Sequence, residues 1–155
     1  RAFLGRNGGL IAELVGAGTG DGQFSSPEGV ALTPGGRVYV ADTENHRVQE
    51  LKFDGTLTFT RKWGRNGGDG SSGAGAGEFD EPGGVAVGDD GRVFVADSGN
   101  NRIQVFTAEG SHLGAWGSFG TGEGEFAFPT GVATRGRVAY VAGGQQHRIQ
   151  WFQLV

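Results

Sequence analysis

The chain has 155 residues, 19% charged residues and a formal net charge of −4, and it is long enough to form one domain with its own core. The mild acidity argues against a nucleic-acid partner, and no apolar run is long enough to span a membrane. The absence of cysteine excludes disulfides and zinc–thiolate sites. Glycine is unusually frequent, with 33 residues, but compact blocks of β-branched and aromatic residues separate the glycines, as in short strands joined by tight turns.

Residues 1–16 align with residues 102–117, and we expect them to form the last two strands of an earlier repeat. Three copies of one pattern follow along the chain, each anchored by a proline in a similar setting: "FSSPEGVAL", "FDEPGGVAV" and "FAFPTGVAT". The anchoring residues are Pro27, Pro82 and Pro129.

Each copy divides into short apolar segments separated by turn signals. After the proline segment come "RVYVAD", "RVFVAD" and "RVAYVAG", and after a polar loop come "HRVQELKF", "NRIQVFTA" and "HRIQWFQL". In the first two copies, Asp54-Gly55 and Glu109-Gly110 then introduce a last segment through a hairpin turn. The segments are too short for helices and show no sustained helical period, which predicts four antiparallel strands in a complete repeat.

The second strand of each copy indicates how the sheets pack. "VYVA" and "VFVA" are apolar on both alternating faces, whereas a half-solvated antiparallel strand would alternate with polar residues. Both faces of each sheet must therefore be covered, and a radial stack of small sheets does this without helices. The sequence predicts an all-β fold, a β-propeller with four-stranded antiparallel blades.

The motifs "P-x-G-V-A", "V-Y-V-A-D" and "N-H-R-V-Q" together resemble NHL repeats over almost the whole chain. The resemblance implies a propeller, usually six-bladed, of which this chain supplies three to four blades' worth. We expect 1–16 to end a preceding blade, 17–64 and 65–117 to form two blades, and 118–155 to form a blade that lacks its last strand.

Three blades or so cannot close a ring, so two arrangements are open. The chain is a fragment of a larger propeller, which the start at Arg1 without methionine favours, or two copies form a homodimer that closes a six-bladed ring. In the homodimer, Leu10–Val15 of one copy would complete the last blade of the other.

One acidic and one basic residue flank the loop between the second and third strands. Asp42 precedes Arg47, and Asp97 precedes Arg102, each by five residues, which predicts a structural carboxylate–guanidinium pair that organises the loop. In the third copy Gly143 replaces the aspartate, so we expect Arg148 to lack this partner. Two interpretations stay open: a degenerate terminal repeat, or a freed cation available to an anionic ligand.

In a propeller these loops share one face with the connections between blades, and we expect that face to bind ligands. The candidate ligand-binding residues are Glu44, Asn45, His46, Asn100, Asn101, Gln145, Gln146, His147 and Arg148. The connection over residues 64–77 is longer than its equivalents and is a further candidate for recognition.

We expect no metal, cofactor or catalytic residue in this chain. Three histidines are too few for a convincing zinc site, "GDGSSG" (Gly68–Gly73) lacks the helix that a phosphate-binding loop needs, and no nucleophile has an evident base. The sequence favours a binding or scaffold module for a protein, peptide or glycan. The alternative is part of a metal-dependent six-bladed lyase or lactonase, an activity that the resemblance allows, with its catalytic residues mostly in other blades.

Overall fold

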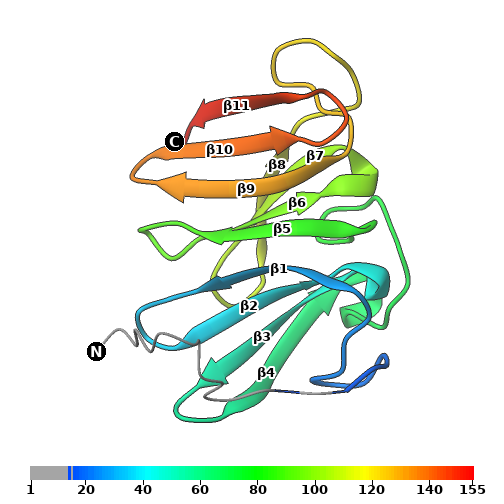
Figure 1. Cartoon of the computed structure of the whole chain (residues 1–155), viewed down its shortest axis with the longest axis vertical. Coiled ribbons are helices and arrows are strands. Elements are labelled where there is room, and N and C mark those ends of the chain that lie inside the picture. Colours follow the sequence, from blue (N-terminus) through cyan, green and yellow to red (C-terminus); the bar gives the residue numbers. More distant parts are fainter. Residues whose placement is uncertain (1–13, 15) are drawn as a thin grey trace, which may run out of the picture.

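The computed structural model describes residue 14 and residues 16–155, and it contains three antiparallel sheets that fan out from a common edge (Figure 1). The first sheet has the order β1-β2-β3-β4, the second β5-β6-β7-β8, and the third, with three strands, β11-β10-β9. The strands are β1 (Pro27–Leu32), β2 (Arg37–Asp42), β3 (Arg47–Phe53), β4 (Leu57–Gly64), β5 (Pro82–Val87), β6 (Val93–Asp97), β7 (Arg102–Phe106), β8 (His112–Trp116), β9 (Pro129–Arg135), β10 (Val138–Gly143) and β11 (Arg148–Gln153).

The all-β propeller architecture is therefore confirmed, with two four-stranded sheets and a third of three strands among the described residues. The strand pair expected within 1–16, including Leu10–Val15, falls outside the described residues except for Leu14 and Gly16. The number of blades in a complete ring stays a prediction. No helix in the described part of the chain is long and apolar enough to cross a membrane.

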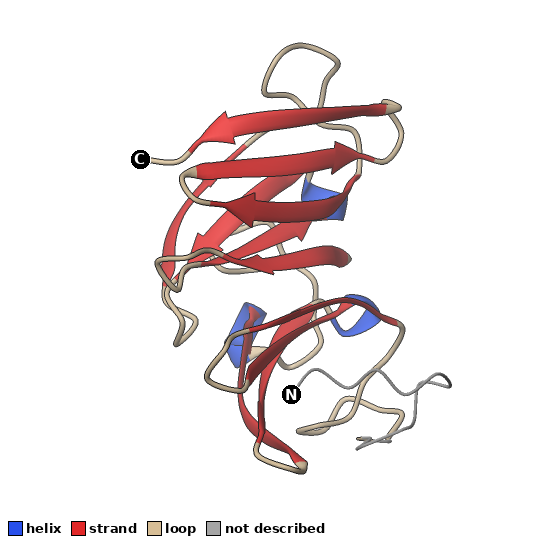
Figure 2. Cartoon of the chain, turned by 60° about the vertical axis from the view of Figure 1, so that its left-hand side comes forward, coloured by secondary structure: helices blue, strands red, loops and turns tan. Residues whose placement is uncertain are grey.

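The second strands are covered on both sides, as their apolar composition predicts. Tyr39 and Phe94 are completely buried, and so are Val93 and Val95, which lie on the opposite side of β6 from Phe94. One hydrophobic cluster joins the first sheet to the second, and another joins the second to the third. Neighbouring sheets thus supply the core that a helical layer supplies in other folds (Figure 2).

The first strands of the three sheets approach one another closely, and glycine makes this possible. A Cβ atom on Gly29 would lie 2.3 Å from the Gly83 carbonyl oxygen, and one on Gly84 would lie 2.8 Å from the Thr130 carbonyl oxygen. Real side chains do not tolerate such distances, so the "P-x-G" and "P-G-G" segments are needed for the inner edges of the sheets to meet.

The polar loops after β2 and β6 are single turns of 3₁₀ helix, η1 (Thr43–Asn45) and η3 (Ser98–Asn100), and a third such turn, η2 (Arg65–Gly67), follows β4. His46 and Asn101 end η1 and η3 with left-handed backbone angles, φ 48° and 55°, and His147 has φ 52° at the equivalent place in the third sheet. Asn and His adopt this conformation more readily than most residues, which explains why one of them directly precedes the arginine in every copy.

Candidate functional site

The loops that follow β2, β6 and β10 lie on one face of the molecule, together with the segments that lead into β1, β5 and β9 (right-hand side of Figure 1). Backbone hydrogen bonds tie each loop to its lead-in segment: Glu44 N donates to Ser25 O, Gly99 N to Asp80 O, and Gly144 N to Phe128 O. We call this surface the loop face. It comprises residues 25–26, 43–46, 80–81, 98–101, 127–128 and 144–147.

A buried polar network supports the first loop. Asp42 is fully buried, and its carboxylate accepts hydrogen bonds from Arg47 Nε at 2.7 Å, from Gln49 Nε2 at 3.0 Å and from the Ser25 N–H at 2.7 Å. The remaining donors of Arg47 bind backbone carbonyls, among them that of Gln23. The expected pair is present, and charge-assisted bonds fix the loop and its lead-in segment as one unit.

The second loop repeats this arrangement nearly atom for atom. Asp97 accepts from Arg102 Nε at 2.7 Å, from Gln104 Nε2 at 2.9 Å and from the Asp80 N–H at 2.8 Å. Burial raises the pKa of Asp97, while these donors favour the ionised carboxylate. The main difference is exposure, because the Arg102 side chain is 17% exposed whereas that of Arg47 is fully buried.

The third loop decides against the second interpretation of Arg148, a freed cation. Arg148 Nε donates to Gln146 Oε1 at 3.0 Å, and its other donors bind the carbonyls of Thr121, Gly122 and Glu125. Gln146 occupies the position of Asn45 and Asn100, and its extra methylene lets the amide reach the space left by the missing carboxylate. A neutral acceptor has replaced a charged one, and the guanidinium keeps its structural role.

The candidate ligand-binding residues therefore divide into two groups. Asn45, Asn100, Gln146 and Arg148 belong to the supporting networks. His46 and Asn101 accept hydrogen bonds from the backbone N–H groups of Glu81 and Phe128, which lie just before the next sheet in each case. Of the nine candidates, the residues left exposed are Glu44, Gln145 and His147. A ligand-binding role for any of the nine residues stays a prediction.

A small hollow of about 290 Å³ lies beside the third loop, lined by Phe119, Thr121, Ala127, Gln145, Gln146 and Arg148. Phe119 is 75% exposed. Its bridge to Phe126 matches the bridge between Ala17 and Phe24, so an aromatic ring stands where the first copy has a methyl group. The sequence contains this signal, but it emerges only when the glycine-rich lead-in segments are aligned, and our expectations did not include Phe119.

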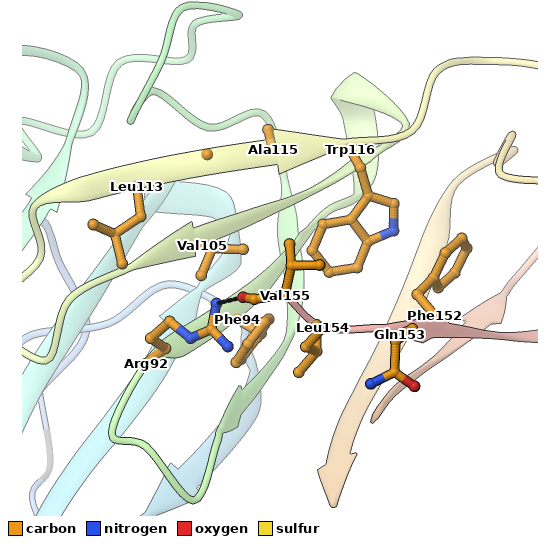
Figure 3. A pocket seen from close by; sticks show the side chains of 11 residues that line it. Arg92, Phe94, Val105, Leu113, Ala115, Trp116, Phe152, Gln153, Leu154 and Val155 are labelled. Atoms are coloured by element: carbon orange, nitrogen blue, oxygen red, sulfur yellow. Dashed lines mark hydrogen bonds between the residues drawn. The ribbon is translucent and has the colours of Figure 1, made fainter. Parts of the chain in front are cut away.

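A larger hollow, of about 380 Å³, opens between the second sheet and the end of β11 (Figure 3). Its walls are mainly apolar and include Leu113, Trp116 and Phe152, and Arg92 Nη1 donates to the Val155 carbonyl oxygen at its rim. Between the first two sheets, the turn from β7 to β8 covers the equivalent location, where Gly110 packs against Trp63. The hollow thus marks the place where the third sheet has no fourth strand among the described residues.

Neither the long connection nor the loop face contains a metal-binding group that can be recognised. Across the described residues, no three His, Cys, Asp or Glu side chains converge as metal ligands would. In the connection over 64–77, Asp69 accepts from the side chain and backbone of Ser71 and from Asn66, which lowers the pKa of Asp69 to about 2. These bonds organise the turn.

Comparisons with known proteins agree with this architecture. Residues 24–51 and 79–106 match the NHL repeat family. The NHL repeat-containing protein 3 of Mus musculus is 34% identical over 94 residues, which cover 59% of this chain and 25% of that protein, so the chain spans about a quarter of this relative.

Among solved structures, the hydrazine synthase of Kuenenia stuttgartiensis has a TM-score of 0.62 at 15% identity, over 89% of this chain and 36% of that one. The gluconolactonase XC5397 of Xanthomonas campestris has a TM-score of 0.56 at 17% identity, over 83% of this chain and 37% of that one. At these identities the likeness concerns the fold alone. The repeat motifs, the radial sheets and the sequence matches together show that the chain contains NHL repeats, at residues 24–51 and 79–106, arranged as blades of a β-propeller.

Proposed function

We propose that the chain is a non-catalytic binding module that presents its loop face to a protein, peptide or glycan partner. The main support is the hollow beside Phe119. It lies next to the loop that follows β10, and the hydrogen bond between Arg148 and Gln146 fixes the conformation of this loop. Side chains that are fixed before a partner arrives lose less freedom on association, so a supported loop binds better than a mobile one.

The hollow suits an apolar group with a polar edge. The exposed ring of Phe119 can pack against an aliphatic side chain or the apolar face of a sugar, and the Gln145 amide offers both a donor and an acceptor. Ligand pockets usually measure about 300–1,000 Å³, so a hollow of this size would hold one side chain or one sugar ring of a longer ligand.

The charges around the first two loops disfavour a nucleic-acid partner. Four carboxylates, those of Glu28, Glu44, Asp80 and Glu81, belong to the loop face or its margin, whereas the only histidine, lysine or arginine in the first loop is His46. Phosphate backbones bind through Lys and Arg, and carboxylates would repel them. A neutral or cationic partner fits this surface better.

The proposal can be tested with a random peptide library displayed on phage and with a glycan array. The double variant Phe119→Ala/Gln145→Ala removes the ring and the amide, and Phe53→Ala/Asp54→Ala is a matched control on the opposite face, at the turn between β3 and β4. We expect ligands selected on the unmodified chain to bind the control equally and the loop-face variant at least about tenfold more weakly. Ligands that bind both variants equally well would contradict the proposal.

The second candidate function is part of a metal-dependent six-bladed propeller lyase or lactonase, with most catalytic residues in other blades. The fold shared with the Xanthomonas gluconolactonase favours it. Titration with Ca²⁺ or Zn²⁺, read out as the melting temperature, separates the two candidates, because a ligand that binds only the folded chain raises its stability. A rise of several degrees would favour the enzyme, and no change would favour the binding module.

A further inference from the structure

Each sheet has a leading side, which faces the next sheet along the chain, and a trailing side, which faces the previous one. On the leading side of the first two sheets, equivalent residues are buried: Tyr39 and Val48 against the second sheet, and Phe94 and Ile103 against the third. Strand register identifies these equivalents, since Ala41 pairs with Val48 and Ala96 with Ile103.

The leading side of the third sheet repeats this surface without a cover. Ala142 pairs with Ile149 and Tyr140 with Trp151, in the same register. Tyr140 is 43% exposed, Ile149 66% and Trp151 73%, whereas their equivalents are almost completely buried. Tyr140 and Ile149 also line a shallow hollow of about 260 Å³.

The trailing side of the first sheet is the complementary case. Val30 pairs with Val40 as Val85 pairs with Val95, but Val30 is 66% exposed whereas Val85 is 7% exposed. Leu32, on the same strand, is 72% exposed. The chain therefore displays both halves of the contact that joins its own sheets, one at each end.

The hydrogen-bonding groups of that contact are also present at both ends. His46 Nδ1 accepts from Glu81 N at 3.0 Å, and Asn101 Oδ1 accepts from Phe128 N at 2.8 Å, each donor lying one residue before a proline. The equivalent acceptor in the third sheet is His147, which is exposed. The equivalent donor in the first sheet is Ser26, whose N–H has no acceptor among the described residues and whose φ of 47° matches that of Glu81.

Glycine spacing supports the same contact. Gly29 and Gly84 are confined by the backbone of the following sheet, while a Cβ on Gly131 would meet only the Ala142 side chain, at 3.5 Å. Gly131 therefore leaves space for the backbone of a following strand, and no strand among the described residues occupies this space. One element is missing: Thr43 and Ser98 donate hydroxyl hydrogen bonds to the carbonyls of Pro82 and Pro129, and Gly144 cannot do so.

We propose that two copies of this 155-residue chain associate head to tail, with the leading side of the third sheet in one copy packed against the trailing side of the first sheet in the other. Such a contact is heterologous, and it ends in a closed ring only if the rotation between copies closes. Two copies with three sheets each would give six, within the range of known propellers. Burial of five large apolar side chains drives the association: Val30, Leu32, Tyr140, Ile149 and Trp151.

Sedimentation velocity of the purified chain over a range of concentrations tests this proposal. We expect a species of twice the 16.0 kDa chain mass. Val30→Asp should abolish association through the trailing side, and Trp151→Glu through the leading side. Leu113→Glu is the control, because Leu113 is 54% exposed on β8, outside both surfaces, and this variant should assemble normally.

Two further measurements separate this contact from a general loss of folding. An equimolar mixture of Val30→Asp and Trp151→Glu retains one intact pair of surfaces, so it should form a heterodimer although each variant alone is monomeric. Gly131→Ala should not strain the monomer, but its methyl group would clash with the first strand of the second copy. This substitution should weaken association about tenfold or more. A monomeric unmodified chain, or a dimer that neither surface variant weakens, would overturn the proposal.

Discussion

Gln146 Oε1 accepts a hydrogen bond from Arg148 Nε at 3.0 Å, where Asp42 and Asp97 accept the equivalent bond from Arg47 and Arg102 at 2.7 Å. The loss of the third aspartate is therefore compensated locally, two residues before the arginine. A longer amide at the asparagine position fills the space next to Gly143, where an added Cβ would lie 3.0 Å from Gln146 Oε1.

The first prediction follows from this compensation. Gln146→Ala should lower the free energy of unfolding by about 1–3 kcal/mol, because it leaves Arg148 Nε and the Gly120 carbonyl without their partner. Gln145→Ala, one residue away and exposed, should change it by no more than about 0.5 kcal/mol. Urea denaturation measures both values, and equal effects of the two substitutions would contradict the interpretation.

A second prediction restores the arrangement of the first two copies. Gly143→Asp alone places a side chain against Gln146, and Gln146→Asn alone withdraws the acceptor from Arg148, so each should destabilise the chain. Together they recreate the aspartate–asparagine pair, and the double variant should be more stable than the sum of the single effects by about 0.5–3 kcal/mol. A double-mutant cycle in urea measures this coupling, and additive effects would refute the compensation.

A third prediction compares the two charged pairs. Asp42→Ala strands the fully buried Arg47 side chain and should cost about 3–5 kcal/mol, whereas Asp97→Ala should cost less because water can reach the partly exposed Arg102. Asp54→Ala is the control, since the Asp54 carboxylate is 58% exposed and lies 3.9 Å from Lys52. Thermal and urea unfolding rank the three variants, and a larger loss for Asp97→Ala would be the contrary result.

Features of the fold that depend on the residue pattern within one repeat could be predicted from the sequence, whereas features that depend on contacts in three dimensions could not. Prolines, glycines and two-sided apolar strands sufficed to predict the radial sheets and the burial of Tyr39 and Phe94, because these depend on patterns within each copy. The role of Arg148 stayed open because it depends on how far one side chain, that of Gln146, reaches in three dimensions. Phe119 was missed because it lies in a segment that composition alone identifies as a flexible loop.

A fourth prediction concerns the inner strands. Gly29→Ala would place a methyl group 2.3 Å from the Gly83 carbonyl oxygen, and the backbone would have to shift, at a cost of at least about 1–3 kcal/mol. Gly131→Ala has room in this chain, so the stability of the monomer should be nearly unchanged. Unfolding measured at concentrations where the chain is monomeric compares the two variants, and similar losses would argue against close packing of the first strands.

The last prediction concerns Glu50, which is 2% exposed on β3. Burial raises the pKa of Glu50, and Arg61 and Arg37 oppose this shift only in part. Arg61 Nε lies 2.9 Å from Glu50 Oε2, but neither atom has a partner in hydrogen-bond geometry. A carboxyl group with a folded-state pKa above its unfolded value of about 4.3 contributes most stability below that pH and loses it as the pH rises through the folded-state pKa.

The free energy of unfolding of the unmodified chain should therefore fall relative to that of Glu50→Gln as the pH rises from about 4 through the raised pKa of Glu50. Glu109→Gln is the control of opposite sign, because a hydrogen bond from Arg37 lowers the pKa of Glu109. The contribution of Glu109 to the stability of the folded chain therefore increases as the pH rises toward the unfolded value of about 4.3. Urea denaturation between pH 3.5 and 8 measures both differences. If the difference in free energy of unfolding between the unmodified chain and Glu50→Gln stayed constant, or if the unmodified chain became relatively more stable with rising pH, the surrounding arginines would outweigh burial at this site.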